Sequence, residues 1–196
     1  MNFLSHLYLS GDSEGIIIGN FIADAVKGNN LGHFSEDIQK GIVLHRKIDS
    51  FTDSHPIVEQ SKQRLRGNYK KYASVIVDIY YDHYLARNWE EYSDIGLQQF
   101  TQNIYRLIQA HHSVLPEKSA HFAKYMIEYN ILFEYSRLAG IQQVFNGMAR
   151  RASFSSNMEY AINDLREHYL LFEEEFKQFF PELKKYILGE LKKVSE

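Results

Sequence analysis

Helix-breaking and strand-forming signals are scarce in this chain, and that scarcity constrains the fold more than any other feature. The 196 residues hold three prolines, at positions 56, 116 and 181, and proline is the residue that most strongly ends or kinks a helix. No segment alternates apolar and polar residues between turn signals, as a half-buried strand would. The sequence therefore predicts an all-α chain, folded as a single-domain multi-helix bundle over residues 1–196.

Cap residues, prolines and apolar periodicity divide the chain into predicted helices. In chain order, these helices span about residues 13–27, 36–54, 56–67, 69–88, 94–112, 116–136, 141–151 and 157–194. Gly28 is the expected end signal of the first helix, because glycine readily adopts the left-handed backbone that follows a helix. Pro181 is expected to interrupt the last helix.

Composition limits the classes of protein and of metal site that this sequence can form. Apolar residues make up 44% of the chain and aromatic residues 14%, which is too much for a disordered chain. With no cysteine present, disulfides and thiolate ligands are excluded, so any metal must be bound by His, Asp, Glu or Asn. The absence of disulfides fits a cytoplasmic location, which is the location we predict.

Neither a targeting signal nor a membrane signal is expected in this sequence. The N-terminus lacks the basic and apolar regions of a secretory leader, and no run of about 18 apolar residues predicts a membrane span. The formal net charge of −3 offers no overall attraction for nucleic acid.

Basic residues nevertheless gather in two places. The first group is Lys62, Arg64, Arg66, Lys70 and Lys71, and the second group is Arg150 and Arg151. A cluster of this kind is either a solvated helix end or a docking patch for an acidic partner.

Three apolar segments each carry a polar pair spaced by one helical turn. The pairs are Asn20 with Asp24, His45 with Asp49, and Asp78 with Asp82. Residues four apart share one face of a helix, and polar groups on a mostly buried face are costly unless they are paired, hydrogen-bonded or bound to a metal. Three such faces in one helical chain predict a shared site, most simply a divalent-metal centre.

Each polar group also has an ordinary structural interpretation. The stripe formed by His45, Asp49 and Asp53 could be a ladder of surface ion pairs. Asp82 could cap a helix or pair locally with an arginine or a tyrosine hydroxyl. His6, alone among apolar residues, could be a satisfied core histidine.

The sequence lacks the motifs of several common catalytic sites. It has no glycine-rich phosphate loop, no Gly-x-Ser-x-Gly elbow and no cysteine nucleophile. Metal-assisted chemistry is therefore expected, since a divalent ion polarises a phosphoryl oxygen and lowers the pKa of water. Carboxylate and imidazole ligands fit Mg²⁺, Mn²⁺ or Fe²⁺.

Several of these segments also follow the pattern of a known family. They are residues 1–7 (Met-Asn-Phe-Leu-Ser-His-Leu), 19–24 (Gly-Asn-Phe-Ile-Ala-Asp) with 27–29 (Lys-Gly-Asn), 41–42 with 45–49 (His-Arg-Lys-Ile-Asp) and 52–53 (Thr-Asp), Asp78 with 82–85 (Asp-His-Tyr-Leu) and Trp89, and 146–149 (Asn-Gly-Met-Ala). The order and spacing of these segments cover nearly the whole chain. In this pattern the sequence resembles the acyl carrier protein phosphodiesterases, also called acyl carrier protein hydrolases.

This resemblance implies a fold, a reaction and a partner. Such enzymes hydrolyse the phosphodiester between 4′-phosphopantetheine and a serine of holo-acyl carrier protein, which would be both partner and substrate here. They are related to the HD-superfamily phosphohydrolases, which are all-helical and often use Mn²⁺, so an HD-like bundle and Mn²⁺ are expected. The His-Asp dipeptide of that superfamily is absent: His45 precedes Arg46, and residues 82–83 read Asp-His. The ligand set is therefore inferred from spacing.

Spacing and resemblance together assign the predicted roles. The predicted metal ligands are Asp24, His45, Asp49, Asp82 and His83, with His6 as a weaker candidate. The predicted catalytic residues are Arg46, Asp53, Asp82 and His83. Arg46, with Lys47 beside it, would neutralise the scissile phosphate, and a nearby His or Asp would protonate the leaving serine oxygen. Asp53, Asp78 and Asn20 would orient the ligands.

Acyl carrier proteins are small and strongly acidic, so a basic surface is expected to dock them. The predicted docking residues are those between Lys62 and Lys71, followed by Arg150 and Arg151. Two other functions fit the same residues. One is hydrolysis of a nucleotide or another small phosphodiester, and the other is non-catalytic binding of an acidic partner, with the polar clusters acting only as ion pairs. The sequence does not predict an oligomeric state.

Overall fold

The computed structural model describes residues 1–195, and the regular structure among these residues is entirely helical. This confirms the all-α prediction. The α-helices are α1 (Phe3–Tyr8), α2 (Glu14–Ile22), α3 (Glu36–Ser54), α4 (Pro56–Tyr69), α5 (Ala73–Arg87), α6 (Leu97–Ala110), α7 (Glu117–Glu128), α8 (Ile131–Glu134), α9 (Leu138–Arg151), α10 (Ala161–Glu167) and α11 (Tyr169–Ser195). The 3-10 helices are η1 (Ala23–Ala25), η2 (Lys70–Tyr72), η3 (Trp89–Glu91), η4 (His112–Val114) and η5 (Met158–Tyr160).

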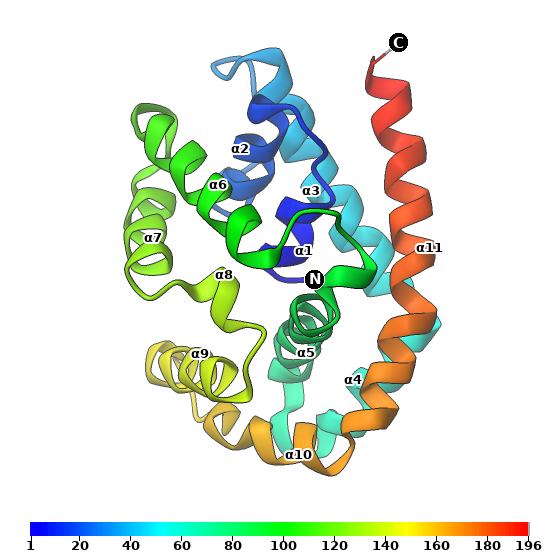
Figure 1. Cartoon of the computed structure of the whole chain (residues 1–196). Helices are drawn as coiled ribbons and strands as arrows, with labels where there is room; N and C mark the ends of the chain where they lie inside the picture. The colour runs from blue at the N-terminus through cyan, green and yellow to red at the C-terminus, as the bar shows by residue number, and fades with distance from the viewer. Residues whose placement is uncertain (196) are drawn as a thin grey trace.

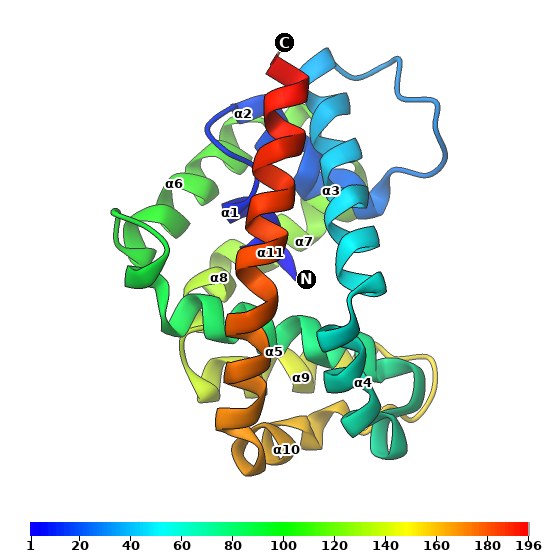
Figure 2. The ribbon, with the colours of Figure 1, turned by 90° about the vertical axis from the view of Figure 1, so that its right-hand side faces the viewer.

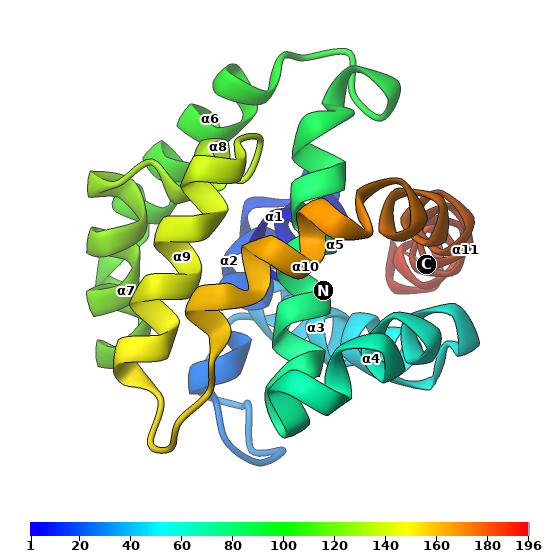
Figure 3. The ribbon, with the colours of Figure 1, turned by 90° about the horizontal axis from the view of Figure 1, so that it is seen from below.

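Helix α5 lies at the centre of the molecule and is packed by α1, α4, α9 and α11 (Figure 1). Its large aromatic side chains Tyr80, Tyr81 and Tyr84 are fully buried. The long helix α11 runs along one side against α3 and α4 (Figure 2). Helices α6, α7 and α9 lie on the side opposite α11 (Figure 3). No helix in the described residues combines the length and the apolar character needed to cross a membrane.

Two glycines bring α2 and α3 into unusually close contact. A Cβ added to Gly19 would lie 2.1 Å from the carbonyl oxygen of Ile38, and one added to Gly41 would lie 2.2 Å from that of Ile16. Only residues without a side chain allow two helix backbones to approach in this way. The contact fixes Asn20, which follows Gly19, against α3.

The helix boundaries depart from the predicted ones where local backbone geometry intervenes. The predicted helix over residues 116–136 is wrong, because Asn130 has φ 50 and ψ 41 and separates α7 from α8. Asparagine tolerates this left-handed conformation better than most residues. Lys70, with φ 50, likewise delays the start of α5 to Ala73. Gly28 does have φ +73, but α2 ends earlier, at Ile22.

Helix α11 continues through Pro181, so the predicted interruption there is wrong. Phe180 and Leu183, on either side of it, are fully buried, and packing of an apolar face outweighs the single backbone hydrogen bond that proline removes. The break falls instead at His168, between α10 and α11. Helix α1 was not predicted, because six residues are too few to show helical periodicity.

Candidate metal centre

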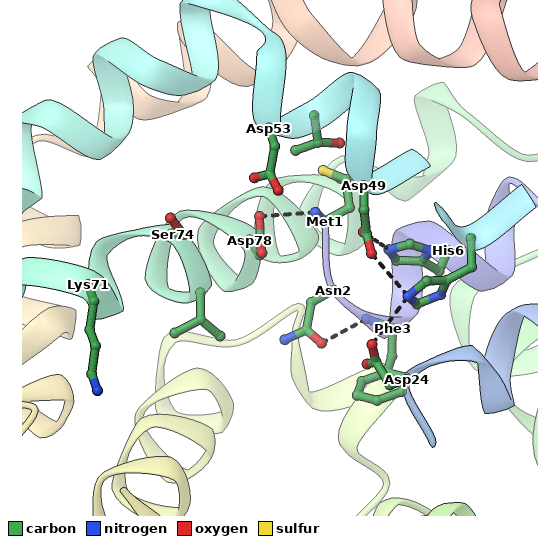
Figure 4. Close-up of a pocket in the computed structure, with 13 residues that line it drawn as sticks. Met1, Asn2, Phe3, His6, Asp24, Asp49, Asp53, Lys71, Ser74 and Asp78 are labelled. Atoms are coloured by element: carbon green, nitrogen blue, oxygen red, sulfur yellow. Dashed lines mark hydrogen bonds and ion pairs between the residues drawn. The ribbon is translucent and has the colours of Figure 1, made fainter. Parts of the chain in front are cut away.

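Helix α1, the region after α2 and helix α3 converge on a pocket of about 370 Å³ (Figure 4). Its lining residues are Met1, Asn2, Phe3, His6, Asp24, His45, Asp49, Thr52, Asp53, Lys71, Ser74, Val75 and Asp78. Four predicted ligands, from three separate helical segments, therefore meet in one place: His6, Asp24, His45 and Asp49. The weaker candidate, His6, is among them.

The Asp49 carboxylate contacts both imidazoles, one oxygen to each ring. Oδ1 of Asp49 is 3.0 Å from Nε2 of His6, and Oδ2 is 3.1 Å from Nε2 of His45. The two rings are stacked, with their centroids 4.1 Å apart. Asp24 approaches from η1, with its Oδ1 3.4 Å from Nε2 of His45 (Figure 4). The ligand atoms of His6, His45 and Asp49 thus gather at one point, and Asp24 approaches it from the side of His45.

Asn20 lies behind both histidines and fixes the orientation of their rings. Its Oδ1 is 3.0 Å from Nδ1 of His6 and 2.9 Å from Nδ1 of His45. Its Nδ2 donates to the backbone oxygen of His6 and to Oγ of Ser10, which identifies Oδ1 as the acceptor facing the rings. Both histidines therefore donate from Nδ1 and present Nε2 to the pocket, which is how an imidazole is held when it binds a metal. The predicted role of Asn20 in orienting the site fits this geometry.

Burial and mutual contacts shift the pKa values of the cluster in opposite directions. Burial lowers the pKa of His45, but hydrogen bonds to Asp24 and Asp49 outweigh burial and raise this pKa to about 9. Burial lowers the pKa of His6 below its ordinary value despite its contact with Asp49. Burial would raise the pKa of Asp49, but hydrogen bonds from the two histidines hold it well below the usual range. Asp49 is therefore a carboxylate, ready to bind a cation.

The residues present fit a divalent cation. The donor atoms of His6, His45 and Asp49 all lie within 4.8 Å of one another. They combine two imidazoles with a carboxylate, a donor set that suits Mn²⁺, Fe²⁺ or Zn²⁺. The buried Oγ1 of Thr52, which also lines the pocket, has no hydrogen-bond partner among the described residues. The pocket therefore offers both a cation site and an unused polar group beside it.

Asp82 lies outside this cluster, so it does not join the ligands as predicted. Its side chain is fully buried and accepts hydrogen bonds from the backbone N–H groups of Leu4 (2.8 Å) and Ser5 (3.2 Å), and from the Ser5 hydroxyl. These two N–H groups belong to the first turn of α1, where backbone donors have no partner within the helix. Asp82 thus caps α1, which carries His6, although it lies far away in the sequence. Burial raises the pKa of Asp82 to about 6.

His83 also lies away from the predicted centre. Its Nδ1 is 2.7 Å from the backbone oxygen of Tyr135, and its Nε2 is 2.9 Å from the hydroxyl of Tyr169. It lines a different pocket, with Arg87 and Arg137. Both ring nitrogens already have protein partners, so the structure does not bring this predicted ligand to the cluster.

Arg46 is placed outside the pocket, in contrast to its predicted role. Its guanidinium donates to the Gly28 backbone oxygen at 2.7 Å and to Oδ1 of Asn29 at 3.0 Å, so it holds the loop after η1. Lys47 pairs with Glu190. Asp53 does line the pocket, and its Oδ1 accepts a hydrogen bond of 2.7 Å from Lys62.

The first predicted docking group is largely engaged within the protein. Lys62 is buried against Asp53, and Arg64 binds Glu175 through two hydrogen bonds of 2.8 and 3.0 Å. Arg66 pairs with Glu59. Their side chains are therefore poor candidates for a free docking surface. Lys70, Lys71, Arg150 and Arg151 remain exposed.

Comparison with known proteins identifies the family. Residues 1–183 match the sequence profile of a family described as "Acyl carrier protein phosphodiesterase". The chain belongs to that family. It is 36% identical over 182 residues to a protein named acyl carrier protein phosphodiesterase from Photorhabdus laumondii, with 92% of both chains covered. A protein of the same name from Yersinia enterocolitica is 32% identical, over 92% of this chain and 94% of its own. No solved structure matches this chain.

Family membership confirms the resemblance and the prediction of a hydrolase, a phosphodiesterase directed at acyl carrier protein. For two pocket residues, Thr52 and Lys71, the sequence analysis did not predict a place in the site. Thr52 is part of the family pattern, but nothing in the sequence showed that its hydroxyl would be buried without a partner. Lys71 was assigned to docking, whereas it also lines the pocket. Its position depends on the turn at η2, which the sequence did not predict.

Proposed function

We propose that this chain uses a divalent metal, Mn²⁺ in the first instance, to hydrolyse the phosphodiester between 4′-phosphopantetheine and the serine of holo-acyl carrier protein. The observation that carries this proposal is the convergence of His6, His45 and Asp49, with both Nδ1 protons held by Asn20. Asp24 completes the set of ligands. The metal would polarise a phosphoryl oxygen and lower the pKa of a water molecule.

The charge of the pocket supports a cation in this role. Asp24, Asp49, Asp53 and Asp78 all line the pocket. Asp53 is paired with Lys62 and Asp78 with the Met1 amino group, whereas Asp24 and Asp49 contact only the two histidines. The charge of Asp24 and Asp49 repels an anionic phosphodiester. Neutralisation of that charge is therefore a condition for substrate binding. Lys71 lies on the pocket wall and would bind a phosphate oxygen as a point charge.

Two further residues of the pocket are assigned roles in the reaction. Asp53 is exposed at the pocket, and we assign its carboxylate to accept a proton from the attacking water and to return it to the leaving serine oxygen. Asp78 accepts a 2.9 Å hydrogen bond from the amino group of Met1, which ties the start of α1 to α5. We therefore assign Asp78 to positioning α1.

The exposed basic residues near the pocket are proposed to dock the acidic carrier. Nζ of Lys71 lies 4.7 Å from the ring centroid of Phe154, a residue just beyond the end of α9. This contact brings the turn at η2 close to the end of α9, where Arg150 and Arg151 lie. The exposed residues of the two basic groups therefore lie near each other, and Lys70 and Arg150 make no ion pair within the described residues.

The substrate is tested by comparing holo-acyl carrier protein with nucleotides and small phosphodiesters in the presence of Mn²⁺. We expect the intact mass of the carrier to fall by the 4′-phosphopantetheinyl group, at a kcat/KM far above that for bis(p-nitrophenyl) phosphate or cyclic nucleotides. Hydrolysis of a nucleotide with the carrier left intact would contradict the proposal. Binding of the carrier without hydrolysis, unaffected by chelation, would identify a non-catalytic binder.

Docking is tested separately with a charge reversal away from the chemistry. The double variant Lys70→Glu and Arg150→Glu is expected to raise KM for the carrier about tenfold, with hydrolysis of bis(p-nitrophenyl) phosphate unchanged. The double variant Arg106→Glu and Lys118→Glu, at exposed positions on α6 and α7, is the matched control and should leave both substrates unaffected. An equal effect of this control would show that only the net charge matters.

A further inference from the structure

A second, mostly apolar pocket of about 220 Å³ adjoins the candidate metal centre. Asn2, Phe3, Asp24 and Val75 line both pockets, so the two spaces share a wall and meet at the ligand Asp24. Figure 4 shows Asn2, Phe3 and Asp24 on the same side of the metal cluster, next to the start of α1. A substrate whose reacting phosphate lies at the metal centre can therefore extend into the second pocket.

The lining of this second pocket is aromatic and aliphatic. Beyond the shared wall, it is formed by α7, α8 and α9 and includes Phe122, Ile131, Val144 and Met148. Such a surface favours a ligand with methyl and methylene groups.

Polar groups of Tyr125, Tyr135 and Arg151 interrupt this apolar lining. Tyr135 lines the pocket and is 1% exposed, and its hydroxyl makes no hydrogen bond within the described residues. Burial holds its pKa well above the ordinary value, so the hydroxyl remains a donor. As a donor at the pocket wall, this hydroxyl could bind a ligand carbonyl. Arg151 contributes a guanidinium at the same pocket, over the ring of Tyr125.

We propose that this pocket holds the pantetheine arm of the substrate, and this rests on the function proposed above. From the phosphate, the arm runs through a methylene to a carbon that bears two methyl groups, and it continues through a hydroxyl-bearing carbon and two amides. The methyl groups fit the apolar wall next to Phe3 and Val75, and an amide carbonyl would accept a hydrogen bond from Tyr135. The pocket therefore selects for the arm, whereas the metal centre acts on the phosphodiester.

The proposal is tested by filling the pocket without touching the ligands. Met148→Trp, on α9, should lower kcat/KM for holo-acyl carrier protein at least tenfold, while hydrolysis of bis(p-nitrophenyl) phosphate and Mn²⁺ affinity remain within twofold of wild type. Gln143→Trp, at an exposed position on the same helix, is the matched control and should change neither rate. Tyr135→Phe should raise KM for the carrier several-fold without changing hydrolysis of the small diester.

Wild-type turnover of the carrier with an unaffected Met148→Trp variant would overturn the pocket assignment and leave the proposed function intact. If wild type does not hydrolyse the carrier, the proposed function fails, and the pocket is then judged by binding alone. D-pantetheine, which has no phosphate, should shift NMR signals of wild type but not of Met148→Trp. Equal shifts in both proteins, or no shifts in wild type, would overturn the assignment.

Discussion

Helices α3 and α5 carry polar residues that look alike in sequence but do different work in the structure. On α3, His45 and Asp49 open onto a pocket and contact His6 and Asp24 there. On α5, Asp82 and His83 are buried and bind protein groups. Asp82 binds the first turn of α1, and His83 binds Tyr135 and Tyr169. A buried polar residue in an apolar helix therefore needs a partner. Only the tertiary structure shows whether that partner is a protein group or a bound ligand.

The two regions are nevertheless coupled through α1. Asp82 holds the N-terminal turn of that helix, and His6 lies in the same helix and contacts Asp49. Asp82 therefore positions a ligand without being one. The comparison predicts that substitutions on α3 remove metal binding directly, whereas substitutions on α5 act on stability and only indirectly on the metal.

The largest effect is expected for His45→Ala. Loss of one of the two imidazoles should abolish measurable Mn²⁺ binding and hydrolysis of the carrier, because an outer partner alone typically changes affinity 10- to 100-fold and a ligand changes it more. Calorimetric titration and circular dichroism measure the two properties. Helical content should stay at the wild-type level, and unchanged turnover would remove His45 from the site.

Asp82→Asn should have the second-largest effect, and this effect should fall mainly on stability. The amide places an N–H₂ group against the backbone donors of α1, so we expect a loss of roughly 2–3 kcal/mol in the free energy of unfolding. Metal affinity should also fall, because α1 carries His6. Urea denaturation, repeated with saturating Mn²⁺, measures both effects. Full stability combined with lost metal binding would instead make Asp82 a direct ligand.

Asn20→Ala tests whether the orientation of the rings matters. Nδ1 of His6 loses its acceptor, and Nδ1 of His45 keeps only the backbone oxygen of residue 20, so the imidazole of His6 in particular can rotate or bind through its other nitrogen. A 10- to 100-fold loss of Mn²⁺ affinity is expected, with a smaller loss of stability than for Asp82→Asn. If affinity is unchanged, the histidines are held by other contacts and the account of Asn20 is wrong.

His83→Gln is the matched substitution on α5 and should have the smallest effect on the metal. We expect Mn²⁺ affinity and turnover within twofold of wild type, with a loss of about 1 kcal/mol in stability from the broken contacts to Tyr135 and Tyr169. A loss of metal binding comparable to that of His45→Ala would show that α5 contributes a ligand as α3 does, and would contradict the comparison.

The metal-free cluster should also respond to pH. The folded-state pKa of His45 is raised to about 9 from the ordinary value of 6.5. The stability contributed by its contacts is therefore fully present below pH 6.5 and lost as pH rises through 9. In the presence of a chelator, the Tm of wild type should fall over this range by more than that of His45→Gln. Parallel curves would show that His45 does not titrate as described.

The sequence predicted the helices and the α3 side of the site because both depend on local spacing. Residues 45 and 49 share a helical face regardless of the rest of the fold. The close packing of α2 against α3 at Gly19 and Gly41 became evident only once both helices were placed. The contact between Asp82 and α1 joins residues 77 and 78 positions apart, which no local pattern reveals. The role of Arg46 was missed for the same reason, since it depends on the path of the loop after η1.

The central claim is that the cluster of His6, His45, Asp49 and Asp24 holds a metal required for hydrolysis of the carrier. The most direct test is to strip the protein with a chelator, add holo-acyl carrier protein, and record the intact mass of the carrier before and after Mn²⁺ is restored. The account predicts that the carrier keeps its 4′-phosphopantetheine without metal and loses it after Mn²⁺ is added. Equal loss in both samples would contradict a metal-dependent site.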